Sequence, residues 1–468
     1  MEYFKHKKSP SNMKKNFSFG SLATTTESPG QQSAEESRPQ TPSNPFATPP
    51  YSRVGSTIGA RSGFQYAEVP GSGYFRSRRV PRSEAVPLPE RKKKRKEKLL
   101  WILPLCGLIC GLGLSGVLIY FKIASTLANK FCQILDEDFS SGSLDSNIWT
   151  HEIELGGFGN EEFEMTTADA ENSWIENGQL HIRPTLQDAT LIDTNSVINL
   201  TATGTCTSVI MSNCVAVTNT TNGTIVPPVK SARLNTKKGA SIKFGKVEVT
   251  AKISKGDWLW PAIWMLPVTD TYGAWPASGE IDIMESRGNN YSYSLGGNNF
   301  FTSTLHWGPD SSNDGYKKTT NSRTASHSLF GDQFHKYGLQ WTDKFLFTYI
   351  DNSLTQALYW KFNQPLWNLG SFPYANANGT AYVDPWASTG QDSTPFDQEF
   401  YLILNVAVGG QNGFFLDGSD GKPWGDSSPY AKKDFWDARD QWYPTWKDKS
   451  GKDISDMVVD RVQMWKKC

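Results

Sequence analysis

Histidine and cysteine are scarce in this sequence, with 6 of each among 468 residues. The histidines are scattered, and no Cys/His spacing typical of a metal site is present. The chain also has no glycine loop suited to a phosphate and no serine-hydrolase elbow. These absences argue against a catalytic metal, a nucleotide-dependent enzyme and a serine hydrolase, so we expect no cofactor and no metal.

Apolar residues are sparse before position 99, where Pro, Ser, Gly and Arg dominate. Such a segment cannot bury enough surface to fold. It is also basic, with 19 Lys and Arg against 8 acids, whereas residues 99–468 hold 28 against 39. We therefore predict a disordered basic tail over residues 1–98, followed by one large acidic domain.

One long apolar run separates these two parts. Residues 99–121 carry no formal charge, and a helix of this length rises about 34 Å, enough to cross a bilayer. Seven Lys and Arg residues stand within residues 91–98, and only two lysines follow the run before Asp136. The positive-inside rule then places the tail in the cytosol and residues 122–468 outside. We predict a single-pass type II protein of the secretory pathway or plasma membrane.

Two alternatives concern this region. The apolar run could be a cleaved signal sequence, although it begins about 100 residues from the start. The basic cluster could be a nuclear-import or nucleic-acid patch, but beside an apolar span it favours membrane orientation, and we expect no nucleic-acid partner.

The cysteines and glycosylation sequons fit an exported domain. Four cysteines lie after the span and permit two disulfides in three possible pairings. We favour Cys132 with Cys468 and Cys206 with Cys214, with free thiols as the alternative. Sequons that suit a secretory lumen occur at Asn199, Asn219, Asn222, Asn290 and Asn378.

From residue 131 onward, short alternating segments rich in Val, Ile, Tyr, Phe and Trp are separated by turns. Clear examples are residues 246–253, 280–285, 345–350, 399–408 and 457–465. No long helical period and no repeat of fixed length appear. The pattern predicts an all-β, two-sheet sandwich with a core from about 131 to 468. All 17 tryptophans lie outside the tail, a surplus typical of platforms on which sugars stack.

The most specific chemical feature is residues 279–285 (GEIDIME), with three carboxylates among strand-forming residues. Side-chain alternation places Glu280 and Asp282 on one face of a strand. One β-bulge, with Met284 as the extra residue, would return Glu285 to that face. Three like charges on one face repel, so the spacing favours a cation or a catalytic mechanism.

A suitable mechanism exists. Retaining glycosidases use two carboxyl groups about 5 to 5.5 Å apart, one as nucleophile and one as general acid/base. The third acid, Asp282, would separate the pKa values of the two glutamates and keep one ionised while the other is protonated.

Residues 279–289 (GEIDIMESRGN) resemble the active-site signature of glycoside hydrolase family 16, in the bulged form typical of laminarinase-like β-1,3-glucanases. Ordered matches span about 330 residues and include WPAIWM at 260–265, WPAS at 275–278, STLHWGP at 303–309, FHKYGLQWT at 334–342, LNVAVGG at 404–410 and the strand at 457–465. The resemblance implies a β-jelly-roll with a concave glucan cleft.

The resemblance also implies residue roles. Glu280 corresponds to the nucleophile, Asp282 to the assisting acid and Glu285 to the acid/base. The implied substrate-binding set comprises sugar platforms or cleft walls at Trp260, Trp264 and Trp275, a polar residue at His306, and sugar contacts at Arg287 and Asn289. A buried ion pair is the alternative for Arg287, and Trp436 is either a cleft-edge stacker or a packing residue.

Two long loops depart from the simplest family pattern. The insert at residues 198–228 and the loop at 370–396 could shape the ends of the cleft and set endo or exo action. The tail and single span ahead of the domain resemble fungal membrane-bound members linked to cell-wall glucan assembly.

Four functions are compatible with these observations. The leading hypothesis is an anchored hydrolase of β-1,3 or mixed β-1,3/1,4 glucan. A transglycosylase would differ only in its acceptor. Animal relatives that bind glucan after losing the acidic residues suggest a non-catalytic receptor, and a structural sandwich with a chance acidic strand is the fourth. All three acids are present, which favours an enzyme.

Overall fold

The computed structural model describes residues 81–84, 87, 96–128, 130–376 and 378–468. Most of the tail predicted for residues 1–98 therefore lies outside the described residues. Helix α1 (Lys96–Ala128) contains a stretch, Trp101–Phe121, that is long and apolar enough to cross a membrane. The helix agrees with the predicted span in length and composition, while its insertion and orientation stay predictions.

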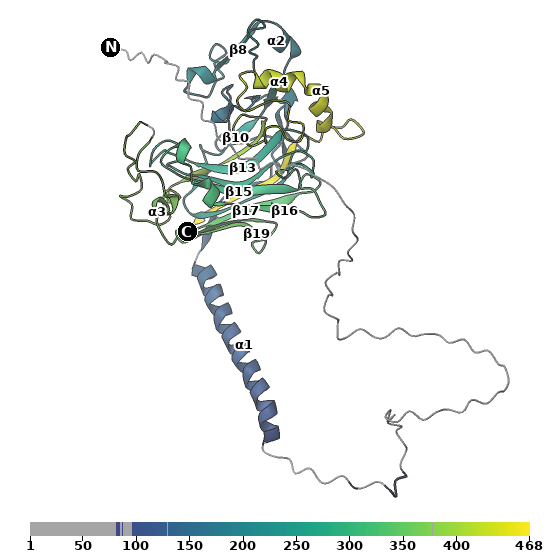
Figure 1. The fold of residues 1–468 in the computed structure, drawn as a ribbon, viewed down its shortest axis with the longest axis vertical. Helices are drawn as coiled ribbons and strands as arrows, with labels where there is room; N and C mark the ends of the chain where they lie inside the picture. Colours follow the sequence, from purple (N-terminus) through teal and green to yellow (C-terminus); the bar gives the residue numbers. More distant parts are fainter. Residues whose placement is uncertain (1–80, 85–86, 88–95, 129, 377) are drawn as a thin grey trace, which may run out of the picture. The chain divides into compact units, whose positions relative to one another are not determined.

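The chain from Phe131 onward forms a sandwich of two antiparallel, eight-stranded sheets (Figure 1). The first sheet has the order β19-β18-β17-β12-β21-β5-β4, with β1 also paired to β21. Its strands are β1 (Phe131–Glu137), β4 (Ser173–Glu176), β5 (Gln179–Ile182), β12 (Gly245–Lys252), β17 (His335–Trp341), β18 (Phe345–Ile350), β19 (Gln356–Lys361) and β21 (Met457–Lys467).

The second sheet has the order β16-β15-β14-β13-β20-β10-β2, with β11 also paired to β20. Its strands are β2 (Thr150–His151), β10 (Arg233–Asn235), β11 (Ser241–Ile242), β13 (Leu259–Pro267), β14 (Glu280–Ser286), β15 (Phe300–His306), β16 (Thr320–Thr324) and β20 (Phe400–Val408). The all-β sandwich expected from the alternating segments is confirmed, and the five example strands agree within two residues at each end.

Smaller elements cover the edges of the sandwich. A three-stranded sheet contains β3 (Glu164–Thr166), β9 (Val229–Ser231) and β6 (Thr185–Leu186), and a hairpin contains β7 (Ser196–Asn199) and β8 (Val215–Thr218). The short helices are α2 (Ala189–Asp193), α3 (Leu366–Gly370), α4 (Ala431–Asp437), α5 (Arg439–Trp442), η1 (Gly157–Gly159), η2 (Met211–Asn213), η3 (Ser311–Asn313), η4 (Tyr316–Lys318) and η5 (Tyr443–Trp446).

The core lies between the inward faces of the two sheets. On β12, Val247, Val249 and Ala251 are fully buried, while the alternate Lys246 and Thr250 are partly exposed, as a half-buried strand requires. Strand β20 is buried at all nine positions, because it lies between β13 and β10 and both of its faces are covered.

Both favoured disulfides are present. Cys132 on β1 pairs with Cys468, and the antiparallel pairing of β1 with β21 brings the two ends of the domain together. Cys206 pairs with Cys214 and closes a short loop in the insert. The asparagines of the predicted sequons are exposed or half-buried, and their glycosylation stays a prediction.

Gly338 of β17 is a point of close approach in the first sheet. It pairs with Tyr349 of β18 on one side and with Glu248 of β12 on the other. The tyrosine hydroxyl donates to Glu248 Oε1 at 2.6 Å. A Cβ atom at position 338 would lie 2.1 Å from the Tyr349 ring, so only glycine permits this contact.

We expect Gly338→Ala to lower the free energy of unfolding by about 1 to 3 kcal/mol, because the ring must move and its hydrogen bond is strained. Chemical denaturation measures the change. Gly425→Ala is the matched control, since a Cβ there would meet only Asp417 at 3.9 Å. Equal stabilities of the two variants would show that the tyrosine adapts without cost.

Candidate active site

The acidic strand β14 carries the predicted β-bulge. Between β14 and β15, Asp282 pairs with Thr304 and Glu285 with Thr302, so two residues of β14 stand opposite Ser303 alone. Against β13, the residue without a partner is Ile283. The bulge is therefore confirmed, but the extra residue is Ile283 and not Met284 as we expected. Both residues are buried in the core.

The bulge places all three acids on the face turned away from the core. Trp275 Nε1 donates to Glu280 at 2.9 Å, and Trp260 Nε1 donates to Glu285 at 3.0 Å. Asp282 is almost fully buried between the two glutamates. Each outer carboxylate thus has an indole N–H that orients it and stabilises its charge.

His306 on β15 links the acids to the next loop. Its Nε2 lies 3.1 Å from Asp282 and 3.8 Å from Glu280, and its Nδ1 lies 2.5 Å from Asp314. Its ring also stacks on Tyr316 at a centroid distance of 5.3 Å. The histidine lies beside the acids, and its predicted role as a polar residue near the sugar stays a prediction. Asp314 was not predicted, because nothing in its local sequence distinguishes it from other loop acids.

Burial raises the pKa of every acid in this cluster, and their mutual repulsion adds to the effect. Burial and the charge of Asp282 raise the pKa of Glu280 to about 8. Burial and the charge of Glu285 raise the pKa of Asp282 to about 6. Burial also raises the pKa of Glu285, against the lowering effect of His306. The cluster therefore retains a proton at neutral pH, which its members share.

His306 has the opposite balance. Burial lowers its pKa, but contacts with Asp282, Asp314 and Glu280 outweigh burial and hold the pKa well above its usual range. A charged imidazolium therefore lies among the carboxylates and lowers the pKa of each of them.

The same sheet face continues past the acids with aromatic and polar groups. Trp264 stands opposite Asp282 in the pairing of β13 with β14, and its Nε1 donates to Asn405 at 2.8 Å. The Arg233 guanidinium carbon lies 4.6 Å from the Trp264 ring and 3.9 Å from the Phe158 ring. Arg233 also pairs with Glu152 at 2.6 Å. The sequence argument missed Arg233 and Phe158. Sheet pairing brings Arg233 of β10 towards Trp264, whereas Phe158 lies in η1, outside the sheets.

A pocket of about 330 Å³ lies beside Trp275, on the side of the acids that faces the loop after β15. Its lining includes Tyr272, Trp275, Asp310, Asn376 and Tyr382. Tyr382 donates to Asp310, which fixes one wall. The predicted loop at 370–396 contributes several of these residues, in agreement with its expected position at one end of the site.

The three tryptophans predicted to be sugar platforms differ in how much of the ring is exposed to a ligand. Trp275 is 42% exposed and Trp264 is half-buried, so both can meet a ligand. Trp260 is only 7% exposed and stacks on Phe414 at a centroid distance of 3.8 Å. Trp260 therefore orients Glu285 and does not provide an open platform.

Three other predicted contacts require correction. Arg287 donates to the carbonyl oxygens of Phe414 and Leu295, so it holds the loop beside Trp260. These contacts replace the ion pair we gave as its alternative, and its contact with a sugar stays a prediction. Asn289 is buried, and its Oδ1 accepts from the Trp258 backbone N–H. Trp436 is 3% exposed and packs with Ile192 and Val226, which leaves the packing role. Their burial prevents Asn289 and Trp436 from contacting a sugar.

Glu280, Asp282 and His306 offer possible metal-ligand atoms within 4.8 Å of one another. Both ring nitrogens of His306 already face carboxylates. A cation would have to displace the contact with Asp282, so the described geometry fits a proton-sharing cluster better than a metal centre.

The fold and this cluster define a β-sandwich protein with a carboxylate site on one sheet face. The family model for glycosyl hydrolases family 16 matches residues 188–394. A beta-1,3-glucan-binding protein of Penaeus monodon is 42% identical over 351 residues, covering 72% of this chain and 90% of that protein. The chain belongs to glycosyl hydrolases family 16.

Two further relatives and one solved structure are less similar to this chain. A beta-1,3-glucan-binding protein 1 of Manduca sexta is 29% identical, over 71% of this chain and 64% of that protein. A glucan endo-1,3-beta-glucosidase A1 of Niallia circulans is 28% identical, over 59% of this chain and 34% of that protein. The laminarinase catalytic domain from Thermotoga maritima superposes with a TM-score of 0.43 at 23% identity, covering 72% of this chain and 99% of that domain.

We expect Asp282→Asn to lower the pKa of His306. A neighbouring carboxylate stabilises the imidazolium over the neutral ring, so removal of the charge lets the proton leave at lower pH. NMR titration of labelled histidines measures the shift, with His306→Gln to assign the signal. Asp351→Asn is the control, because Asp351 contacts His335 and not His306. An unchanged His306 pKa in Asp282→Asn would contradict the contact.

Proposed function

We propose that residues 131–468 form a retaining glycoside hydrolase that cleaves β-1,3 or mixed β-1,3/1,4 glucan. The observation that carries this proposal is the bulged strand β14, which holds Glu280, Asp282 and Glu285 on one face with an indole N–H on each outer glutamate. Family membership supports the class of reaction. A shared face for the two glutamates, which the bulge allows, suits the two carboxyl groups that retention requires.

In the first step, Glu280 attacks the anomeric carbon and forms a glycosyl ester while Glu285 gives its proton to the leaving oxygen. In the second step, Glu285 takes a proton from water, whose oxygen attacks the anomeric carbon and releases Glu280. Each step breaks one C–O bond and forms another, so no cofactor is needed. Asp282 and His306 hold the charge balance around Glu280.

The electrostatics of the cluster suit this division of labour. One retained proton among the acids is what a general acid needs at neutral pH. The raised pKa of about 8 puts this proton on Glu280 in the free site, so the proposed reaction requires the proton to pass to Glu285 and leave Glu280 ionised when the substrate binds. Trp275 N–H and the His306 imidazolium both stabilise the Glu280 anion.

Glucan is the preferred substrate class for two reasons. Trp264 and Phe158 both contact the Arg233 guanidinium, and the three side chains extend an aromatic and hydrogen-bonding surface along the face that carries the acids. Sugar rings stack on surfaces of this kind. The relatives from Penaeus monodon and Niallia circulans carry glucan in their names.

A second candidate is a glucan-binding protein without catalysis. The names of the Penaeus monodon and Manduca sexta relatives favour it. The complete acid cluster favours hydrolysis, because burying three carboxylates around an imidazolium is costly and binding alone does not require it. A transglycosylase would use the same residues with a sugar hydroxyl in place of water.

The setting of the enzyme is part of the proposal. Helix α1 would anchor the chain as a type II membrane protein, with residues 122–468 outside the cytosol and glycosylated at the predicted sequons. Two disulfides in the described domain support an oxidising compartment. The likeness of this architecture to fungal membrane-bound members stays a prediction.

We expect Glu280→Gln to abolish glucan cleavage and Glu285→Gln to slow it by about 10² to 10⁴-fold, since one loses the nucleophile and the other the proton donor. Chromatography of products from laminarin and a short β-1,3-glucan oligomer measures both. The full chain is used in a detergent without a sugar headgroup. Glu399→Gln is the matched control, because Glu399 is exposed and contacts Ser241.

Product lengths decide among the candidates. Shorter products from wild type and the Glu399 variant alone support hydrolysis, and products longer than the starting oligomer indicate transglycosylation. A wild-type protein that binds the oligomer but leaves its length unchanged contradicts the catalytic proposal and favours the binding protein.

A further inference from the structure

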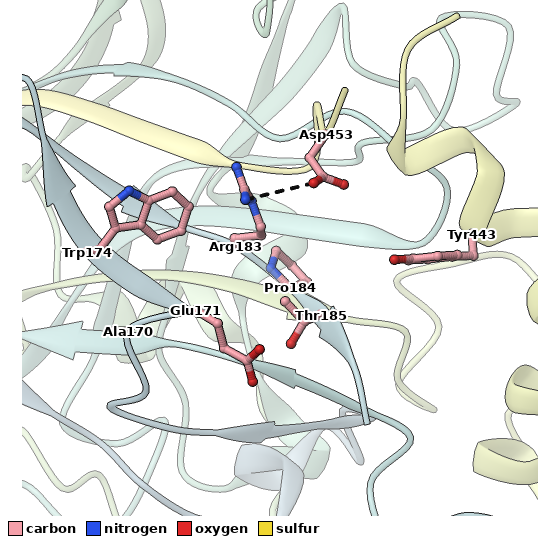
Figure 2. A pocket seen from close by; sticks show the side chains of 8 residues that line it. All are labelled: Ala170, Glu171, Trp174, Arg183, Pro184, Thr185, Tyr443 and Asp453. Carbon is pink, nitrogen blue, oxygen red and sulfur yellow. Dashed lines mark ion pairs between the residues drawn. The ribbon is translucent and has the colours of Figure 1, made fainter. Parts of the chain in front are cut away.

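A second pocket lies on the first sheet, apart from the acids. It has a volume of about 350 Å³, and its lining includes Glu171, Trp174, Arg183, Thr185, Tyr443 and Asp453 (Figure 2). Trp174 comes from β4 and Arg183 follows β5, whereas the acids lie on β14 of the second sheet. No residue of this pocket takes part in the site described above.

Aromatic rings stand on two sides of the pocket. Figure 2 shows Trp174 and Tyr443 on opposite sides of Arg183. The indole stacks on His181 of the neighbouring strand, with a centroid distance of 4.7 Å and an interplanar angle of 13°. Strand β4 is the last in its sheet, so no strand lies beyond the half-buried indole. Trp174 is therefore a fixed ring at an open edge.

The charged groups around the pocket compensate one another. Arg183 donates to Asp456 at 2.6 Å and lies 3.8 Å from Asp453. Lys447 also approaches Asp453, at 3.7 Å, and Lys230 pairs with Glu171. Since positive and negative groups are already paired, the pocket has little net attraction for an anion or a cation.

Paired groups of this kind still suit hydroxyl groups. A carboxylate oxygen has more than one acceptor site, and a guanidinium has five N–H donors. A sugar hydroxyl both donates and accepts, so it can bond to Asp453 and Arg183 without breaking their pairing. His181 stacks on the Trp174 ring and the Arg183 guanidinium carbon lies 4.6 Å from its centroid. The apolar face of a sugar ring can therefore pack on Tyr443 or against the part of Trp174 that these two side chains leave exposed.

We propose that this pocket is a second carbohydrate-binding site, which takes a short stretch of a neutral oligosaccharide. Its volume lies near the lower end of the roughly 300 to 1,000 Å³ of small-molecule sites. The choice of β-1,3-glucan as ligand rests on the proposed function. Two sites on one chain would raise the affinity for long glucan more than for short oligomers, because the second contact becomes intramolecular.

The test uses the full chain with Glu280→Gln, so that bound sugar is not consumed, in a detergent without a sugar headgroup. Titration calorimetry with a short β-1,3-glucan oligomer should resolve two binding sites. Adding Trp174→Ala should remove one of them and weaken retention on insoluble glucan about tenfold, the loss expected for one aromatic contact. Trp174→Phe keeps an aromatic ring and should retain both sites.

The result that overturns the proposal is a Glu280→Gln chain in which every glucan-binding site survives Trp174→Ala. If Trp174→Ala fails to fold, Tyr443→Ala at the opposite wall gives the same decision. Hydrolysis by the wild-type chain is scored separately. A chain without hydrolysis but with a Trp174-dependent site refutes the proposed enzyme and supports this pocket, whereas hydrolysis without a Trp174-dependent site does the reverse.

Discussion

The structure around the acids depends on one constraint, which is the repulsion among three carboxylates that the β14 bulge brings to the same face. A buried carboxylate must be neutralised or stabilised by donors and positive charge. Trp275, Trp260 and His306 supply those contacts from three different places in the chain. The retained proton supplies the remainder, so the property that makes the cluster costly also makes it useful for acid/base chemistry.

The supporting contacts explain why the surrounding residues are where they are. Trp260 can direct its N–H at Glu285 because Phe414 stacks on its ring, and Arg287 holds Phe414 through its carbonyl oxygen. Asp314 fixes the far side of His306. Trp260 and His306 are thus each held by a second contact, which limits the freedom of the acids that they touch before any ligand binds.

The local residue pattern predicts which side chains share a strand face. It does not predict which distant residues the sheet pairing brings to that face. Two-residue alternation was sufficient to place Glu280 and Asp282 on one face and to require a bulge before Glu285. It could not choose between Ile283 and Met284 as the extra residue, since both are apolar and buried. Arg233 lies 47 positions before Glu280 and reaches the same face only through the order β14-β13-β20-β10.

Misassigned side chains show the same limit. Asn289 and Trp436 have polar or aromatic groups suited to a sugar, but composition does not reveal burial. Trp436 packs against Ile192 and Val226 beneath the insert, whereas Trp174 attracted no attention in the sequence and lies at an open strand edge. Among 17 tryptophans, the sheet topology decides which are core and which face solvent.

Catalysis and glucan binding place different demands on the same chain, and the structure allows them to be separated. Under the proposed function, hydrolysis would depend on the charge balance at Glu280, Asp282 and Glu285, so loss of one acid would abolish or slow it. Retention of a polymer depends on aromatic surface, which continues past the acids at Trp264 and Phe158. A relative could therefore lose the acids and still bind glucan through the surface that remains. On this argument, relatives can be named as binding proteins while this chain keeps an intact acid cluster. Only the acids distinguish the two functions.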